Sequence, residues 1–277
     1  MKKIFIIAIT FTVIFFALVI KNAHSKINSS STTFSYFSMD QISKKNSNAE
    51  IEVPILVYHD VAPWPIQAFN LTESLTIKPG DFEKQMKYLY DHGFTPITLQ
   101  ELKAIWDGVK EPPKKPIVLT FDDGDKGVFK YAFPILKKYK FHFVIFLITK
   151  YTNYHTNFYM NKDEILEMVR SNLVEVGSHT RDHVNLKKVD YKKAYFEICS
   201  SKSDIKKYVG LNATSFCYPF GGYSETAIKA LKYCGFTLAT TENYGFASDK
   251  QNPFLLKRIR IDGRDSLGIF IEKISKF

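Results

Sequence analysis

Short apolar runs alternate along the chain with longer segments in which apolar residues recur every three or four positions. The short runs are typical of buried strands, and the longer segments are typical of amphipathic helices. The expected strands cover 54–60, 94–97, 117–120, 141–148, 173–177, 214–217, 236–239 and 256–261. The expected helices cover 81–92, 99–106, 128–139, 164–169, 191–208, 224–233 and 266–274. Because strands and helices alternate throughout, we expect an α/β fold, with a mostly parallel sheet and helices outside it.

Local signals support several of these helix boundaries. Thr98 is a capping residue directly before the second expected helix. Asn161 and Glu164 form a capping-box pattern before the fourth. Pro134 lies inside the third expected helix, where a proline disturbs regular hydrogen bonding.

The N-terminal segment has the features of a secretion signal. Lys2 and Lys3 precede an uncharged, largely apolar run over 4–20, and this arrangement directs a chain to the secretion machinery. Ala23 and Ser25 form a weak cleavage pattern, so a cleaved signal peptide and an uncleaved signal-anchor both remain open. Residues 26–50 are rich in Ser, Asn, Thr and Lys, which is typical of a flexible linker.

These features predict a signal peptide or signal-anchor at 1–25, a linker at 26–50 and one folded domain at 51–277. We therefore expect an extracytoplasmic protein, either membrane-anchored through its N-terminal segment or secreted, at the cell surface. The net charge is +10, but the lysines are spread along the chain and no nucleic-acid-binding motif is recognisable. We expect no nucleic-acid partner, and a monomer.

The cysteines follow no metal-binding spacing. Cys199, Cys217 and Cys234 are the three in the chain, and they match neither a zinc ribbon nor a CxxC motif. We interpret them as mostly small buried apolar residues, and a single disulfide among them remains open.

Two adjacent carboxylates follow a short apolar strand. Asp122 and Asp123 follow the run 117–120 and precede Gly124. In α/β folds, the carboxyl ends of strands are where catalytic residues gather. Neighbouring residues of an extended chain point in opposite directions, so the two carboxylates can face different partners. A simple Asp-Asp-Gly turn is the alternative.

A pair of histidines follows another strand. His179 and His183 lie four residues apart directly after 173–177, a spacing at which both can face one metal ion. Two imidazoles and one carboxylate form a common catalytic zinc set. Together with Asp122 and Asp123, they predict a metal-dependent active site at the carboxyl ends of the strands.

Three motifs together resemble the NodB-type polysaccharide deacetylases, carbohydrate esterase family 4. They are Thr-Phe-Asp-Asp-Gly at 120–124, His-Thr-Arg-Asp-His at 179–183 and Tyr-Pro-Phe-Gly at 218–221. The resemblance implies a distorted (β/α) barrel of the NodB-homology type over 51–277. It also implies that Asp123, His179 and His183 bind one divalent ion, zinc by expectation, with cobalt, nickel or iron as alternatives. By the same resemblance, Asp122 is the general base.

The chain departs from the commoner family pattern in two places. Cys217 stands where many members have an arginine that holds the base, and the usual late Leu-x-His motif is not recognisable. Tyr-His-Asp-Val at 58–61 is instead similar to the subgroup that acts on poly-β-1,6-N-acetylglucosamine, in which the acid histidine comes early. We therefore expect His59 to be the general acid, a structural strand-end histidine being the alternative.

An arginine near the C-terminus is expected to replace the missing one. Arg258 and Arg260 are the candidates, and we choose Arg258 because its place in Leu-Lys-Arg-Ile resembles the subgroup. We expect only one of the two to point into the site.

The resemblance implies a hydrolase that removes N-acetyl groups from N-acetylglucosamine units of a cell-surface polysaccharide, as in biofilms. The expected substrate is poly-β-1,6-N-acetylglucosamine, and a peptidoglycan or chitin N-deacetylase and a non-catalytic glycan-binding protein are the alternatives. Tyr218, Phe220 and Tyr223, with Trp64, are candidates for contacts with sugar rings, although core packing explains such aromatic residues equally well.

Overall fold

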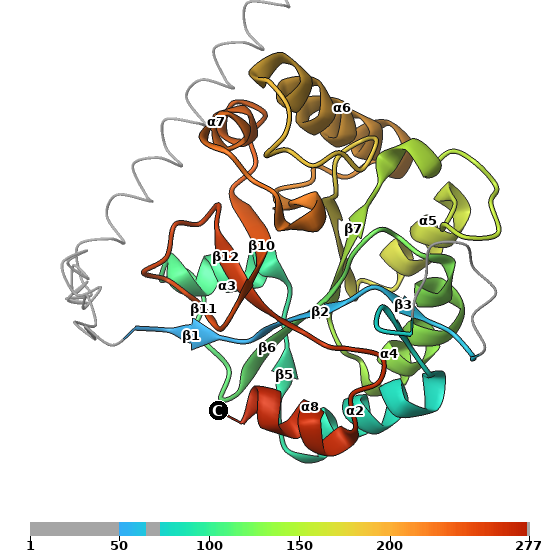
Figure 1. Cartoon of the computed structure of the whole chain (residues 1–277). Helices are drawn as coiled ribbons and strands as arrows, with labels where there is room; N and C mark the ends of the chain where they lie inside the picture. Colours follow the sequence, from blue (N-terminus) through green and yellow to red (C-terminus); the bar gives the residue numbers. More distant parts are fainter. Residues whose placement is uncertain (1–49, 65–72, 276–277) are drawn as a thin grey trace, which may run out of the picture. The chain divides into compact units, whose positions relative to one another are not determined.

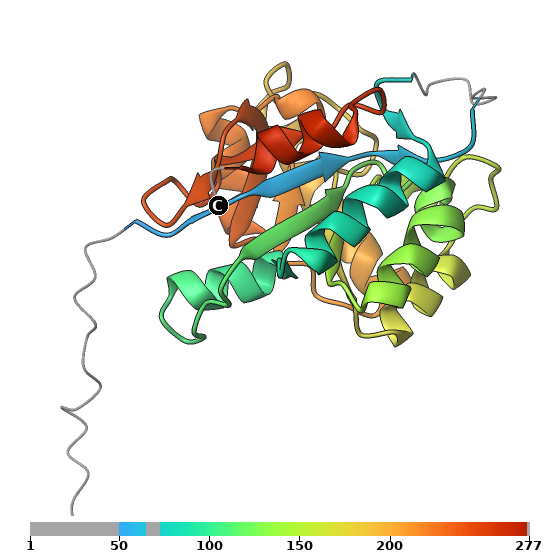
Figure 2. The same cartoon turned by 90° about the horizontal axis from the view of Figure 1, so that it is seen from below.

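The computed structural model describes residues 50–64 and 73–275, and Figures 1 and 2 show how its elements are arranged. An eight-stranded parallel sheet forms its centre. The strand order is β2 (Ile55–Tyr58), β12 (Leu256–Arg260), β10 (Leu238–Tyr244), β9 (Ser215–Cys217), β8 (Val174–Ser178), β7 (Phe143–Leu147), β6 (Pro116–Phe121) and β5 (Thr95–Pro96). Because β2 also pairs with β6, all of these strands except β5 close into a barrel. The expected distorted (β/α) barrel is confirmed.

Helices cover the outside of this barrel (Figure 1). They are α2 (Pro79–Asp91), α4 (Phe133–Tyr139), α5 (Lys162–Arg170), α6 (Tyr191–Val209), α7 (Glu225–Tyr233) and α8 (Leu267–Ile274). Helix α3 (Leu99–Trp106) packs its apolar side chains against the interior of the barrel, near the end where the strands begin (Figure 2). The opposite end, where the strands finish, is therefore left for a site.

Short elements complete the fold. Strand β1 (Glu52–Val53) pairs with β11 (Ala247–Ser248), and β3 (Asp60–Val61) pairs with β4 (Thr76–Ile77). Three single turns are η2 (Val128–Ala132), η3 (Thr149–Tyr151) and η4 (Pro219–Gly221). Apart from η2, which begins the helix predicted over 128–139, these pieces were not predicted as separate elements, because runs of two to five residues carry no periodic signal.

The helix predicted over 128–139 is divided in two. Its first turn, η2, is a π-helix, and α4 begins only at Phe133, so that Pro134 lies in the first turn of an α-helix. A proline is tolerated there because its missing N–H would have no partner in any case. The two predicted caps are present: Thr98 and Asn161 each form a capping box.

Alternation along the strands decides which residues enter the barrel. On β6, Leu119 packs in the outer core beneath the helices, whereas Val118 packs in the inner core. On β2, Leu56 is likewise an outer residue and Ile55 an inner one. Side chains two residues apart share a face of a strand. The alternation between inward and outward side chains therefore continues into the residues directly after each strand. The inward series are 55, 57 and 59; 118, 120 and 122; 175, 177 and 179; and 256, 258 and 260.

A disulfide joins two of the outer helices. Cys199 on α6 is bonded to Cys234 directly after α7, with 5.3 Å between their Cα atoms. The interpretation of the cysteines as buried apolar residues is therefore wrong for this pair, and it holds for Cys217, which is free and buried.

The predicted signal segment and linker lie outside the described residues. Within 50–64 and 73–275, no helix combines the length and the apolar composition needed to cross a membrane.

Candidate active site

A pocket of about 460 Å³ opens at the end of the barrel where the strands finish. Its floor and walls come from the ends of several strands and the loops that follow them. It is lined by His59, Leu75, Asp122, Asp123, Ile148, Tyr159, His179, His183, Phe220, Glu242 and Arg260. The histidines and aspartates that the sequence singled out, which are up to 124 positions apart in their numbering, thus meet in one cavity.

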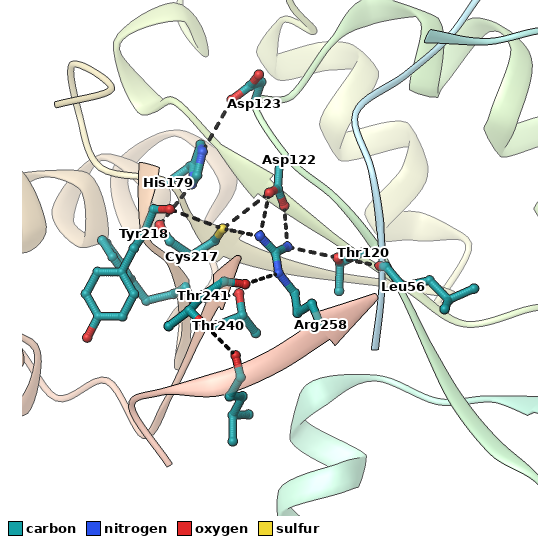
Figure 3. Close-up of polar contacts among 12 residues, drawn as sticks. Leu56, Thr120, Asp122, Asp123, His179, Cys217, Tyr218, Thr240, Thr241 and Arg258 are labelled. Atoms are coloured by element: carbon teal, nitrogen blue, oxygen red, sulfur yellow. Dashed lines mark hydrogen bonds and ion pairs between the residues drawn. The ribbon is translucent and has the colours of Figure 1, made fainter. Parts of the chain in front are cut away.

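Asp122 is held by a buried arginine from the far end of the chain (Figure 3). Arg258 donates from Nη1 to Asp122 Oδ1 and from Nη2 to Asp122 Oδ2, both at 2.8 Å. The guanidinium also donates to Thr120 Oγ1 and to the carbonyl of Thr241. Two parallel bonds of this kind fix a carboxylate in orientation as well as in charge. The expected contact between Arg258 and Asp122 is present.

The pKa of Asp122 reflects this pairing. Burial raises the pKa of the carboxyl, but the charge and hydrogen bonds of Arg258 outweigh burial and lower it to about 2. Asp122 is therefore ionised at neutral pH, as a general base must be.

Cys217 lies beside this ion pair. Its Sγ is 3.1 Å from Arg258 Nη2 and 3.4 Å from Asp122 Oδ2. A cysteine is short, so the guanidinium that enters from β12 has room next to Asp122 (Figure 3). Position 217 has a cysteine where many family members have an arginine. Arg258 reaches the same carboxylate from another strand and takes over that contact.

The expectation that only one of the two arginines points into the site is wrong. Arg260 lines the pocket, whereas Arg258 is buried beneath it. Residues two positions apart on a strand share a face, so both enter the barrel, at different depths.

Asp123 turns toward the two histidines. Its Oδ1 lies 3.3 Å from His179 Nε2 and 3.2 Å from His183 Nε2, and these three ligand atoms lie within 4.8 Å of one another. Although it is buried, Oδ1 has no hydrogen-bond partner among the described residues. Burial raises the pKa of Asp123, but the two imidazoles outweigh this and hold it well below its usual range. A carboxylate and two imidazoles whose ligand atoms converge in this way fit a divalent cation.

The other ring nitrogen of His179 fixes its orientation. Nδ1 lies 2.9 Å from the carbonyl oxygen of Cys217, which can only accept, so Nδ1 carries a proton and Nε2 is the nitrogen left to bind a metal ion when the imidazole is neutral. A bond of this kind behind a metal ligand sets both tautomer and ring angle.

A second cluster fits a cation poorly. Asp122, His179 and Cys217 also lie within 4.8 Å of one another. However, both oxygens of Asp122 are bonded to Arg258, whose positive charge faces the same space. The cluster of Asp123, His179 and His183 is therefore the candidate metal site.

Strained backbone accompanies the three motifs. Asp123, Thr180, His183 and Phe220 all have φ between 58° and 66°, the left-handed region that non-glycine residues rarely adopt. Each such residue costs of order 1–3 kcal/mol, and such residues concentrate at functional sites. Gly124, at φ 85°, lets the chain turn directly after the carboxylates.

His59 enters the pocket from the end of β2, in the inward series that begins with Ile55. Burial lowers the pKa of His59, although the charges of Asp122 and Asp123 raise it. The neutral imidazole therefore predominates at pH 7.

The three aromatic candidates occupy different places. Phe220 is 60% exposed, lines the pocket and lies against the ring of His183, at 4.6 Å between centroids. Tyr218 is completely buried and packs against Phe216, and the half-buried Tyr223 packs against Tyr218. Neither tyrosine lines the pocket. Trp64 lies in a different cavity.

Sequence reasoning missed Tyr159 and Glu242 as pocket residues. Tyr159 comes from an irregular loop, and Glu242 lies on β10, which continues to Tyr244 although it was predicted to end at 239. Had the strand predicted over 236–239 been extended to its observed end, it would have included Glu242. Nothing in the local sequence pattern marks Tyr159.

Comparison with known proteins agrees with this site. The family model for polysaccharide deacetylase matches residues 109–239, which hold all three motifs. YxkH of Bacillus subtilis (strain 168), a polysaccharide deacetylase by name, is 29% identical over 226 residues, covering 80% of this chain and 77% of its own. The poly-β-1,6-N-acetyl-D-glucosamine N-deacetylase of Staphylococcus aureus (strain MRSA252) is 28% identical over 206 residues, covering 68% and 69%.

A solved structure shares the fold over nearly all of its length. It is the Streptococcus pyogenes deacetylase PplD in complex with acetate, with a TM-score of 0.75 and 26% identity, covering 82% of this chain and 99% of that one. Together the fold, the motifs and these matches show that the chain carries a polysaccharide deacetylase domain over 109–239 and resembles deacetylases over about four fifths of its length. It is a hydrolase acting on amide bonds. His59 and Arg258 lie outside the matched range 109–239, and the barrel brings them to the motif residues.

Proposed function

We propose that this protein removes N-acetyl groups from N-acetylglucosamine units of a cell-surface polysaccharide, and that the substrate is poly-β-1,6-N-acetylglucosamine. The observation that carries the proposal is the convergence of Asp122, Asp123, His59, His179 and His183 on one pocket. The Staphylococcus aureus relative, named as a deacetylase of that polymer, supports the choice of substrate.

The metal in this proposal is a single divalent ion, zinc, held by Asp123, His179 and His183. Such an ion would polarise the acetyl carbonyl and lower the pKa of a bound water. The chain's own contribution is to hold the three ligands in place, through the bond from His179 Nδ1 to the Cys217 carbonyl and through the left-handed backbone at Asp123 and His183.

Asp122 is the general base in this proposal. It lines the pocket next to the metal ligands and is ionised, so it can accept a proton from the attacking water. Arg258 positions it, because both carboxylate oxygens are bonded to one rigid guanidinium. The backbone N–H of Phe220 is our candidate donor to the oxygen that gains negative charge.

His59 is the proposed general acid for the departing amine. Because burial lowers its pKa, the protonated form is scarce at neutral pH, but it releases its proton readily. The charges of Asp122 and Asp123 on the facing wall favour the protonated form as the reaction proceeds.

An extracytoplasmic location is part of the proposal. The disulfide between Cys199 and Cys234 supports it, because disulfides persist in oxidising compartments. The predicted anchor at 1–25 would keep the domain near the membrane surface.

The glycan-binding alternative loses its main support here. Cys217 in place of the family's arginine is the feature that favours a non-catalytic protein, but Arg258 bonds the carboxylate that an arginine at 217 would have held. No contact in the described residues favours peptidoglycan or chitin as the substrate.

Acetate release from separate glycans tests the proposal. The purified protein should release acetate from poly-β-1,6-N-acetylglucosamine faster than from peptidoglycan or chitin at equal acetyl content. A preference for peptidoglycan or chitin would contradict the linkage while leaving the chemistry in place. No release from any of the three would contradict the chemistry.

A further inference from the structure

Helix α6 lies beside the loop that carries two of the candidate metal ligands. The helix is on the outside of the barrel, between α7 and α5 (Figure 1). Glu197, Ser201 and Asp204 recur along it at spacings of four and three, so they share one face of the helix. Glu197 and Ser201 are completely buried, although both are polar. All three bond either to residues 178–183 or to the segment that pairs with them.

Glu197 holds the backbone between the two histidine ligands. Its Oε2 accepts a hydrogen bond from the backbone N–H of Asp182 at 2.9 Å. Asp182 directly precedes His183, so this bond fixes the peptide next to the second imidazole. Oε1 of Glu197 is paired with Lys193 Nζ at 2.7 Å, which balances the charge of a carboxylate that has no exposed surface. A buried carboxylate would be costly without such partners, and these two direct it at the loop.

Ser201 reaches the same loop through Ser178. Ser201 donates its hydroxyl proton to the carbonyl of Ile198 at 2.8 Å, so Ser178 must be the donor in the 2.6 Å contact between the two serine hydroxyls. The hydroxyl oxygen of Ser178 in turn accepts the N–H of Thr180 at 3.2 Å. Ser178 and Thr180 are the two chain neighbours of His179. A directed chain of hydrogen bonds therefore runs from α6 to both sides of the first histidine ligand.

Asp204 supports the segment that pairs with this loop. Its Oδ2 accepts a hydrogen bond from the hydroxyl of Thr149 at 3.0 Å. The N–H of Thr149 donates to the carbonyl of Thr180 at 3.2 Å, and the N–H of Lys150 donates to the carbonyl of Arg181 at 3.1 Å. Residues 149–150 therefore lie along the loop, and α6 holds them in that place.

The loop needs support because its backbone is strained. Thr180 and His183 have φ of 63° and 59°, in the left-handed region that residues with a side chain rarely adopt. Such a conformation persists only where the surrounding structure holds it. The bonds from α6 reach the backbone of Thr180 and Asp182, which are adjacent to the two ligands. They therefore favour the loop conformation in which both imidazoles face Asp123.

We propose that Glu197, with Ser201 and Asp204, is a positioning residue of the metal site, and that this face of α6 holds residues 178–183 in the conformation that binds the metal ion. The inference rests on the proposed function for the presence of a metal ion at Asp123 and the two histidines. Replacing a residue that holds metal ligands without touching the metal typically weakens metal binding by about 10–100-fold.

Metal affinity measures this role without turnover. The Kd of the full-length protein for zinc is obtained by competition with a chromophoric chelator. Glu197→Ala should raise this Kd about 10–100-fold, because the N–H of Asp182 loses its acceptor. Glu197→Gln should stay within about threefold of the wild type, since an amide oxygen can accept the same N–H. Ser201→Ala should raise the Kd toward the lower end of the range for Glu197→Ala.

Kinetics should show the same pattern. In Glu197→Ala, acetate release should fall when zinc is limiting. Saturating zinc should restore most of kcat and leave KM for the glycan unchanged, because the variant binds metal more weakly but keeps every residue that lines the pocket.

The double variant Cys199→Ser, Cys234→Ser is the matched control for lost stability. Cys199 lies two positions from Glu197 on α6, but its disulfide joins the helix to the end of α7 and not to the loop. At temperatures where this variant is folded, its Kd for zinc should equal that of the wild type. Equal weakening in the control and in Glu197→Ala, or an unchanged Kd in a folded Glu197→Ala, would overturn the positioning role. If Glu197→Ala does not fold, Ser201→Ala decides by the same comparison.

These measurements separate the role of α6 from the proposed function. A wild-type protein that binds zinc but releases no acetate from any N-acetylated glycan contradicts the proposed function, and the Kd values still decide the role of Glu197. Acetate release by the wild type together with an unchanged Kd in Glu197→Ala contradicts only the role of Glu197. A wild-type protein that binds no zinc contradicts both.

Discussion

Removing the guanidinium of Arg258 should change the pH dependence of the enzyme. Arg258 and Asp122 are 1% and 2% exposed, and two bonds of 2.8 Å join them. Arg258→Met keeps an unbranched side chain of similar length but deletes the charge and all five donors. Asp122 then stays buried with no opposite charge in contact with it.

The structure sets the size of the effect. The pKa of Asp122 is lowered from 3.8 to about 2, which corresponds to native-state stability on the order of 2 kcal/mol. Because the folded pKa is the lower one, this stability is present above about pH 4 and is lost as the pH falls toward 2. Loss of a contacting opposite charge raises a carboxyl pKa by about 1–3 units, and burial then adds to the rise instead of being offset.

The assay is acetate release as a function of pH, with folding and metal content measured in parallel. The acidic limb of kcat/KM should move to higher pH by about 1–3 units, because Asp122 must lose its proton to act as a base. The variant should also lose about 3–5 kcal/mol of stability, so rates should be measured well below its melting temperature.

Lys257→Met is the matched control, because Lys257 is its exposed neighbour on β12. It should leave the profile unchanged. A folded Arg258→Met variant that retains metal and shows an unshifted acidic limb would refute the role of Arg258.

Further variants test other parts of the site and fold. His59→Ala should lower the rate about 10²–10⁴-fold and retain the metal, whereas near-normal activity, or loss of metal with activity, would contradict the acid role; the exposed His92→Ala is its control. His179→Ala should lose both metal and activity, and full metal occupancy by elemental analysis would contradict its role as a ligand. Cys199→Ser should lower stability by about 3–4 kcal/mol in thermal unfolding, since the disulfide closes a loop with a sequence separation of 35, and an unchanged melting temperature would count against the disulfide. Alkaline phosphatase fused after Glu50 should be active if residues 1–25 export the chain, and inactivity beside a working cytoplasmic reporter would contradict export.

Periodicity in the sequence was enough to predict the order of the main elements. Helix α3 was predicted with its observed bounds, because Thr98 and Glu101 form its capping box and its apolar residues recur regularly. The closure of the barrel could not be derived in this way. It depends on pairing between β2 and β6, which are 58 to 66 positions apart in the chain, and local patterns carry no information on such contacts.

The residues of the site could be predicted from the sequence, but the burial and orientation of their side chains could not. The motifs identified Asp122, Asp123 and the histidine pair, and the resemblance identified His59 and Arg258. Burial of His59 within the pocket, which lowers its pKa, depends on packing from several strands. The simultaneous inward orientation of Arg258 and Arg260 follows from their spacing of two, and this simple consequence of strand geometry was overlooked.

The aromatic residues show where sequence reasoning reaches its limit. Tyr218 and Phe220 belong to one motif, yet Tyr218 is buried in the core and Phe220 is exposed at the pocket. The left-handed backbone at Phe220, at φ 58°, turns this side chain outward. The residue types at 218–221 do not indicate left-handed backbone at Phe220, because such backbone is expected at glycine.

Acetate release measured against bound metal tests the central claim most directly. The purified protein should release acetate and expose free amines on poly-β-1,6-N-acetylglucosamine in equal amounts, at a rate proportional to its zinc content up to one ion per chain. Chelation should abolish the reaction, and added zinc should restore it. A protein that carries one bound metal ion per chain and binds the glycan without releasing acetate would contradict the claim.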